Sequence, residues 1–346
     1  MEAIRDSIFI SSFRALCKSI GVIFGIFLAL IPIFFFFSLF SKGGDISPTT
    51  TLTFLPDANG SREIQAISTP VILQLTLHGI IGEGDLTGQV VNNQLIDSRS
   101  GLLKPDRVKA LLLNLQTPGG TVMDSDTIYR LLLAYKEKYH VPIYAYVDGL
   151  CASGGMYIAC AADKINAAPS SIVGSVGVVA GPFFNLKEAM TKLGINAETI
   201  TQGKNKDSLN PFRTWKPDED GVIKAITTYF YNQFLTIVTS ARPQVTKEQL
   251  LQEYGAAIFD PIKAQEIGYI DNGNSSYLNT LKELLAAVDI SEDTPYQVVE
   301  LQPRKSWLET ITSPDANSAL SSLLQLLGFP KKSSVDSYFS YLYAPG

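Results

Sequence analysis

The stretch Cys151-Ala152-Ser153-Gly154-Gly155-Met156-Tyr157 decides the fold of this 346-residue chain. It follows an apolar run that is typical of a buried strand, and it begins a segment with helical spacing. The small residues around Ser153 leave room for another backbone to approach the hydroxyl group. A serine at a strand-to-helix turn predicts a hydrolase, but its activating base has to come from elsewhere in the chain.

The segments on either side of this turn alternate between strand-like and helix-like patterns. β-branched and apolar runs predict strands at Val71–Leu77, Val108–Leu115, Pro142–Val147, Lys164–Ala168, Ile172–Val179 and Ile195–Thr201. Apolar residues three and four positions apart predict helices at Met123–Tyr139, Ser153–Ala162, Leu186–Leu193 and Glu219–Ser240, and Thr246-Lys247-Glu248-Gln249 fits a capping box. This alternation is typical of an α/β fold in which helices cover a largely buried sheet.

Activation of the serine is the chemical problem, because a free hydroxyl is a weak nucleophile that needs an adjacent base. The histidines of the chain are His78 and His140, and His140 stands between charged residues and a proline, where we expect a solvated loop. A histidine-based triad is therefore not favoured. Residues 201–217 offer lysine instead, at Lys204 and Lys206.

A lysine acts as a base only when it is neutral, so a dry pocket would have to lower its pKa from about 10.4 by roughly three units. Asp207 would oppose that change if its carboxylate lay close to Lys206. Since adjacent residues of an extended segment point to opposite sides, we expect Asp207 to face away from the pocket that receives Lys206. A solvated basic loop is the alternative interpretation of this segment.

Three further features lie near the expected site. The turn at 116–121 precedes a helix, so the N–H groups of Gly119 and Gly120 could stabilise the oxyanion of acyl transfer, although turn chemistry alone also explains Pro-Gly-Gly. Ser175 lacks the Gly-x-Ser-x-Gly spacing of a nucleophile elbow, and we assign it to a pocket wall with at most a supporting role. Cys151 has no partner in view that would stabilise a thiolate, so we interpret it as a small apolar residue.

Taken in order, these segments resemble the signal peptide peptidase A family of membrane-bound serine proteases. The resemblance covers residues 70–275 and rests on Thr117-Pro118-Gly119-Gly120, on residues 152–159 and 168–178, on Lys206-Asp207 with Pro211-Phe212, and on residues 264–271. It implies an α/β fold of the Clp-protease/crotonase type, with layered β-sheets and surrounding helices. Gln116-Thr117 replaces the usual Asn-Ser, and residues 256–260 replace a basic, threonine-containing stretch.

The resemblance also implies the roles of the site residues. By it Ser153 is the nucleophile, Lys206 is the general base, and Gly119 and Gly120 form part of the oxyanion hole, with no metal or organic cofactor. Lys204 is the alternative base, but Lys206 directly precedes the acidic residue, as in the family pattern. Members of the family are similar to ring-forming oligomers in which the lysine of one protomer completes the serine site of its neighbour, so a homo-oligomer is implied.

The N-terminal region differs in kind from the rest of the chain. The 23 positions from 19 to 41 carry no charge, which is enough to cross a hydrocarbon core of about 30 Å. No small-residue cleavage pattern follows them, so we favour a retained transmembrane anchor at 19–41 over a cleaved signal peptide. Three basic residues precede the span and Lys42 alone follows closely, which favours a cytoplasmic tail at 1–18. We expect a linker at 42–68, a Ser/Lys peptidase domain at 69–290 and an extension of unassigned role at 291–346.

With the anchor, the resemblance implies a serine endopeptidase, anchored in the cell (inner) membrane, that degrades released signal peptides or other short apolar peptides outside the cytoplasm. The net charge of −5, without a basic block, gives no footprint for nucleic acid. Two alternatives stay open: a catalytically silent scaffold that binds peptides or organises a membrane complex, and a crotonase-type acyl-CoA enzyme. The membrane anchor counts against the latter.

Overall fold

The computed structural model describes residues 8–40, 50–104, 106–291, 294–304 and 339–342, and it divides into two units, residues 1–48 and 49–346. The first unit contains the helix α1 (Ile8–Phe40), with Pro32 inside it. Its stretch Phe13–Leu30 is long and apolar enough to cross a membrane, by length and composition.

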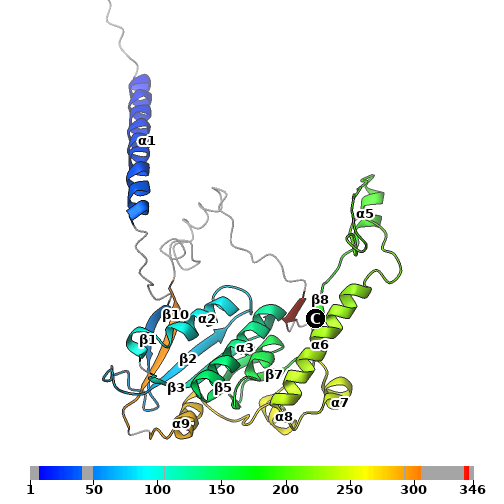
Figure 1. Cartoon of the computed structure of the whole chain (residues 1–346). Helices are drawn as coiled ribbons and strands as arrows, with labels where there is room; N and C mark the ends of the chain where they lie inside the picture. Colours follow the sequence, from blue (N-terminus) through cyan, green and yellow to red (C-terminus); the bar gives the residue numbers. More distant parts are fainter. Residues whose placement is uncertain (1–7, 41–49, 105, 292–293, 305–338, 343–346) are drawn as a thin grey trace, which may run out of the picture. The chain divides into compact units, whose positions relative to one another are not determined.

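The second unit is built on a sheet with eight strands in the described residues (Figure 1). Their spatial order is β1, β10, β2, β3, β5, β7, β9, and β6 pairs with β5 outside this path. Neighbours from β10 to β7 run parallel, whereas β1 and β9 are antiparallel to their partners. The bounds are β1 (Thr50–Leu55), β2 (Val71–His78), β3 (Val108–Thr117), β5 (Ile143–Ala152), β6 (Lys164–Ala167), β7 (Ile172–Gly174), β9 (Ile258–Phe259) and β10 (Gln297–Pro303).

Alternation of side chains along the strands divides the core into two apolar layers. Leu111 and Leu113 of β3 are buried in the cluster that includes residues of α3, α4 and α6, whereas Leu112 is buried with residues of α9. Helices therefore cover both faces of the sheet, which confirms the α/β prediction. The helices are α2 (Gly88–Asp97), α3 (Val122–Tyr139), α4 (Gly154–Ala159), α5 (Lys187–Lys192), α6 (Gly221–Ala241), α7 (Lys247–Gln249), α8 (Pro261–Glu266) and α9 (Tyr277–Ala287), with single turns at Gly101–Leu103 and Leu250–Tyr254.

A second, short sheet lies at the end of α3, where its strands follow the order β4 (Gly119–Thr121), β11 (Phe339–Leu342), β8 (Val179–Ala180) (Figure 1). β11 is antiparallel to both neighbours. Residues far apart in the chain thus form one small sheet next to the turn that carries Ser153.

Three segments differ from the sequence predictions. Residues 50–55, predicted as linker, form β1, and residues 297–303, predicted as part of the extension, form β10; the two strands pair with each other and join the main sheet through β2. The folded unit therefore reaches beyond 69–290 on both sides. Residues 195–201, predicted as a strand, are irregular and exposed, because in the described residues they have no strand partner.

Candidate active site

Ser153 lies at the turn between β5 and α4. Its backbone has φ 56° and ψ −114°, a region that residues with a Cβ atom rarely adopt. The Ser153 N–H donates to the carbonyl of Gly174 at 2.9 Å, and the Ser153 carbonyl accepts from the N–H of Tyr157 at 3.0 Å. These bonds hold the strained turn from both sides. Hydrolases present their nucleophile at a sharp strand-to-helix turn of this kind.

Ser153 is almost fully buried at this turn. The residue is 1% exposed, and its side chain does not cap α4. Within the described part of the chain the structure gives the hydroxyl no hydrogen-bond partner. The candidate serine therefore lies buried at the edge of the sheet without a hydrogen-bonded base in the described residues.

The small residues after Ser153 set the position of α4. A Cβ atom on Gly155 would lie 2.7 Å from Cγ2 of Thr117, so only glycine lets the helix start against β3. Thr117 stands opposite Cys151 in the parallel pair of β3 and β5. Because both strands end at the same edge, Ser153 and the glycines after Thr117 come together there, as the sequence predicts.

The two glycines predicted for the oxyanion hole differ in their availability. The N–H of Gly119 already donates to Oγ1 of Thr117 at 3.1 Å. Ile81 donates to the carbonyl of Gly119 and accepts from Thr121, both at 2.9 Å, so alternation turns the N–H and C=O of Gly120 to the other edge of β4. Gly120 is thus the better candidate of the pair.

Gly154 is a further candidate donor that the sequence predictions do not include. In a nucleophile elbow, the N–H of the residue after the nucleophile is one of the oxyanion donors. Gly154 is that residue, and it is buried as the first residue of α4. The strand-to-helix turn was the signal that could have identified it.

Lys206 is not brought to Ser153 within one chain. It is exposed in a turn of the segment 181–216, which we call the arm, between β8 and α6. In the described part of the chain the structure gives its ammonium group no hydrogen bond or ion pair, and the same holds for Lys204. The helix of the arm, α5, buries none of its residues. The dry pocket expected for Lys206 does not exist in the single chain.

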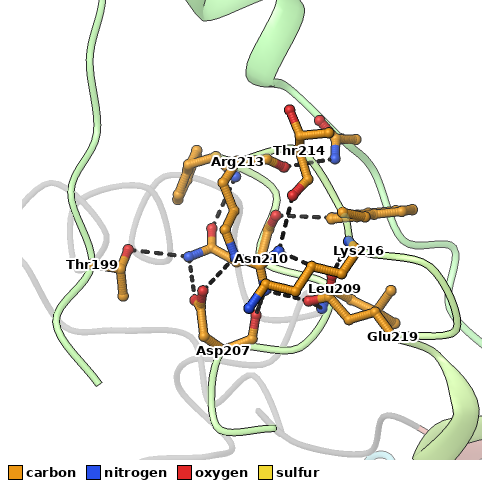
Figure 2. A network of polar contacts seen from close by, with 11 residues as sticks. Thr199, Asp207, Leu209, Asn210, Arg213, Thr214, Lys216 and Glu219 are labelled. Atoms are coloured by element: carbon orange, nitrogen blue, oxygen red, sulfur yellow. Dashed lines mark hydrogen bonds and ion pairs between the residues drawn. The ribbon is translucent and has the colours of Figure 1, made fainter. Parts of the chain in front are cut away.

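A network of ion pairs fixes the turn that carries Lys206 (Figure 2). The Arg213 guanidinium donates to the carboxylates of Asp207 and Glu219 and to the Asp207 carbonyl. Hydrogen bonds from Arg213 lower the pKa of Glu219 to about 2 and, with a further bond from Asn210, hold the pKa of Asp207 below its usual range. The Asp207 carboxylate is therefore paired with Arg213. The backbone at Lys206 and Asp207 forms a turn, whereas we predicted an extended segment.

No hydrogen bond joins the remaining candidates to Ser153 in the part of the chain that the structure describes. Ser175 also has a positive φ of 56°, donates its N–H to Ala257 and lines a cavity of about 940 Å³ together with residues of α6. His78 and His140 are exposed at the ends of β2 and α3. Burial raises the pKa of the Cys151 thiol far above its usual range, which disfavours a thiolate nucleophile.

The fold and this edge define an α/β protein with a serine elbow of the hydrolase kind. A family model described as Peptidase family S49 matches residues 136–289. A putative protease of Synechocystis sp., slr0021, is 31% identical over 205 residues, which cover 59% of this chain and 68% of that protein. The chain belongs to peptidase family S49, and its resemblance to the signal peptide peptidase A family is confirmed.

Other similarities cover different shares of the proteins compared. A putative signal peptide peptidase SppA of Enterococcus faecium is 29% identical over 262 residues, 72% of this chain and 73% of that protein. The chain spans about a quarter of the length of Na(+)/H(+) antiporter NhaA from Brucella melitensis, at 31% identity over 185 residues and 52% of this chain. Among solved structures, a ClpP1 mutant from Listeria monocytogenes has a TM-score of 0.40 and 17% identity, covering 62% of this chain and 96% of its own.

Proposed function

We propose that this chain is a membrane-anchored serine endopeptidase that hydrolyses released signal peptides or other short apolar peptides. The observation that carries the proposal is the strained backbone of Ser153 at the turn between β5 and α4. Strain of this kind persists only where the surrounding structure enforces it, and it is found where a side chain has to be presented for chemistry. Membership of family S49 supports the same activity.

The reaction follows from the groups at this edge. Lys206, supplied in neutral form, takes the proton of Ser153 as Oγ attacks the scissile carbonyl. The N–H groups of Gly120 and Gly154 receive the oxyanion. The lysine then gives its proton to the leaving amine, and it activates the water that hydrolyses the acyl-enzyme.

We propose that Lys206 reaches the serine of a neighbouring copy. The arm that carries it exposes large apolar side chains, a pattern that marks interaction surfaces. Those with at least two-fifths of their surface exposed are Phe184, Leu186, Leu193, Ile195, Ile200 and Phe212. A homo-oligomer in which each arm packs on the next copy would cover these side chains and desolvate the lysine.

The substrate class and the location follow from the rest of the chain. β11 pairs with β4 and β8, which demonstrates that an extended segment fits between these two edges. A peptide bound in this way has to be unfolded, as a released signal peptide is. With α1 as a single span and a cytoplasmic N-terminus, the site would face the extracytoplasmic side, near apolar peptides left in the membrane.

The test uses the full chain in detergent micelles and an apolar peptide that carries a fluorophore and a quencher. We expect Ser153→Ala and Lys206→Ala each to abolish hydrolysis, whereas the matched variant Lys204→Ala retains it. Unchanged hydrolysis in Ser153→Ala would overturn the proposal and favour the scaffold alternative.

Coexpression of the two inactive variants tests whether the site is shared. If one copy supplies the serine and its neighbour the lysine, random assembly into a ring leaves about one quarter of the interfaces intact. We therefore expect about one quarter of the parent activity. Absence of any recovery in assembled rings would place both residues of the dyad in one chain.

A further inference from the structure

The helix that follows Ser153 is held in place through a tyrosine. Tyr157 lies in α4 and is fully buried. Its hydroxyl donates to Oδ1 of Asp126 in α3 at 2.6 Å. Its ring contacts the rings of Tyr129 in α3 and Phe234 in α6, at centroid distances of 5.4 and 5.1 Å. Because α4 has only six residues and a helix of that length is not stable alone, these contacts with its neighbours fix its position.

Asp126 joins three helices through one carboxylate. Besides Tyr157 of α4, the side-chain amide of Gln233 in α6 donates to Oδ1 of Asp126 at 3.3 Å. The other oxygen, Oδ2, pairs with Arg130 one turn later in α3 at 2.7 Å, and the Arg130 side chain is 61% exposed. The two oxygens therefore differ in their tasks. Oδ1 binds the buried tyrosine, whereas Oδ2 forms a surface ion pair of a kind that contributes little to stability.

The peptide unit between Ser153 and Gly154 connects this carboxylate to the proposed reaction. The carbonyl of that unit accepts from the Tyr157 N–H at 3.0 Å. The same planar, trans unit contains the Gly154 N–H, which points opposite to the carbonyl. This N–H is one of the two donors proposed for the oxyanion. The position of Tyr157 therefore sets the direction in which the Gly154 N–H points.

We propose that Asp126 is a positioning residue for peptide hydrolysis: it holds the Tyr157 hydroxyl, and Tyr157 in turn aims the Gly154 N–H at the oxyanion. The inference rests on the proposed peptidase function. Asp126 acts through Tyr157 and the backbone, and it takes no proton from the substrate. A donor stabilises an oxyanion best when its direction is fixed before the reaction. A loosened α4 would therefore slow hydrolysis without weakening the binding of substrate.

A purely structural role for Asp126 predicts different kinetics. If the carboxylate only satisfies a buried hydroxyl, its removal lowers stability, but the folded protein hydrolyses peptide with the kcat of the parent. Positioning predicts a lower kcat at unchanged KM, because the oxyanion exists only in the transition state. Loss of a whole oxyanion donor lowers kcat about 10²–10³-fold. Since the Gly154 N–H is displaced and not removed, we expect kcat to fall about tenfold.

The experiment compares the full chain in detergent micelles with Tyr157→Phe, with Asp126→Ala and with the double variant, at a temperature well below the Tm of each. Tyr157→Phe keeps the packed ring and removes only the hydroxyl. We expect all three variants to have a kcat about tenfold lower at equal KM, and the double variant to be no slower than either single one, because both changes remove the same hydrogen bond. A peptide aldehyde, whose oxygen takes the oxyanion position in the adduct with Ser153, should bind about tenfold more weakly to each of them.

Three matched variants serve as controls. Asp126→Asn keeps an acceptor oxygen toward Tyr157, and the bond from Gln233 holds the amide in that orientation, so it should restore the kcat of the parent. Tyr129→Phe removes a hydroxyl from the neighbouring ring, and Arg130→Gln removes only the ion pair at Oδ2, so both should keep that kcat as well. A parent-like kcat in Tyr157→Phe and Asp126→Ala, whatever their Tm, would overturn the inference. Losses that add in the double variant, or a rise in KM alone, would overturn it too.

A readout without catalysis separates this inference from the proposed function. In the Ser153→Ala background, amide hydrogen exchange at residues 154–158 should be faster with Asp126→Ala than without it. Exchange in residues 108–115 of β3 should be the same in both, which controls for unfolding. Faster exchange without peptide hydrolysis by the parent would retain the anchoring of α4 by Asp126 and reject the peptidase. Hydrolysis by the parent, with equal kcat values and equal exchange in the variants, would do the reverse.

Discussion

Replacement of Ser153 by glycine should stabilise the protein relative to replacement by alanine. Both variants lack the nucleophilic hydroxyl and both are expected to be inactive, so they differ only in the Cβ atom. With φ 56° and ψ −114°, that atom is held in a backbone region that only glycine adopts without strain. The comparison therefore measures the strain stored at the turn.

The magnitude follows from the geometry. A strained residue costs about 1–3 kcal/mol, and we take about 3 kcal/mol because this ψ is far from the left-handed helical value of about +47°. Glycine loses about 0.7 kcal/mol through the entropy of the unfolded chain and about 0.8 kcal/mol through the missing buried methyl group. The remaining gain of about 1.5 kcal/mol corresponds to a Tm that is about 3–6 °C higher.

Thermal unfolding of the full chain in detergent, followed by circular dichroism, provides the assay. Ala152→Gly is the control, because Ala152 is buried one residue earlier and has no positive φ. In Ala152→Gly the unfolded-chain entropy and the missing methyl group both lower stability, and no strain is relieved. We therefore expect the free energy of unfolding to fall by about 1.5 kcal/mol. If Ser153→Gly melted no higher than Ser153→Ala, the turn would not be strained and the argument for a nucleophile elbow would fail.

Three further predictions concern the oxyanion edge, the arm and the cysteines. Gly120→Ala would place a methyl group 1.9 Å from the backbone carbonyl of Ile81, so β4 has to shift and the N–H of residue 120 is displaced. The kcat/KM for peptide hydrolysis should therefore fall about 10²–10³-fold, as on loss of one oxyanion donor, and a normal value would exclude Gly120 from the site. Depressed carboxylate pKa values mean that the Arg213–Glu219 pair is fully formed above pH 4.5 and lost as the pH falls toward 2. Pepsin should therefore cut the arm of the parent at pH 2 but not at pH 4, whereas it should cut the Arg213→Gln variant at both pH values. Equal cutting of the parent at pH 2 and pH 4 would contradict this prediction. Burial raises the pKa of Cys151 above its usual range and that of Cys160 to about 12, so iodoacetamide at pH 8 should leave hydrolysis unchanged, and inhibition traced to either thiol by mass spectrometry would refute their burial.

The centre of the fold could be predicted from the sequence because its signals are local. The runs that form β2, β3 and β5 are mostly apolar, since both faces of a parallel strand are buried. The turn at Ser153 was predicted from small residues between a strand and a helix, and the structure places it there. The start of α7 at a capping box was likewise readable from Thr246 and Gln249.

The parts that could not be predicted depend on contacts between distant segments. Thr50–Leu55 looks like a polar linker until it pairs with a strand some 250 residues later, and β11 has no meaning without β4 and β8. The sequence does not reveal that the N–H of Gly119 is already used, because its acceptor is the side-chain hydroxyl of Thr117. Thr117 belongs to the pair Gln116-Thr117, which replaces the usual Asn-Ser of the family. The pairing of Lys206 with Ser153 follows only from the family resemblance and stays a prediction, because Lys206 is exposed on the arm of the single chain.

In the proposed reaction, Ser153 and its base come from different parts of the molecule. Ser153 follows β5 of the main sheet and Gly120 belongs to β4 of the short sheet, whereas Lys206 stands on the exposed arm. Under the proposal, the arm of a neighbouring copy has to reach the serine before it reacts. The proposed anchor α1 would confine the copies to one surface and raise their effective concentration, so this contact would form far more readily in a membrane than among dilute free chains. The proposed dyad would therefore be completed at the membrane, where its proposed apolar substrates are present.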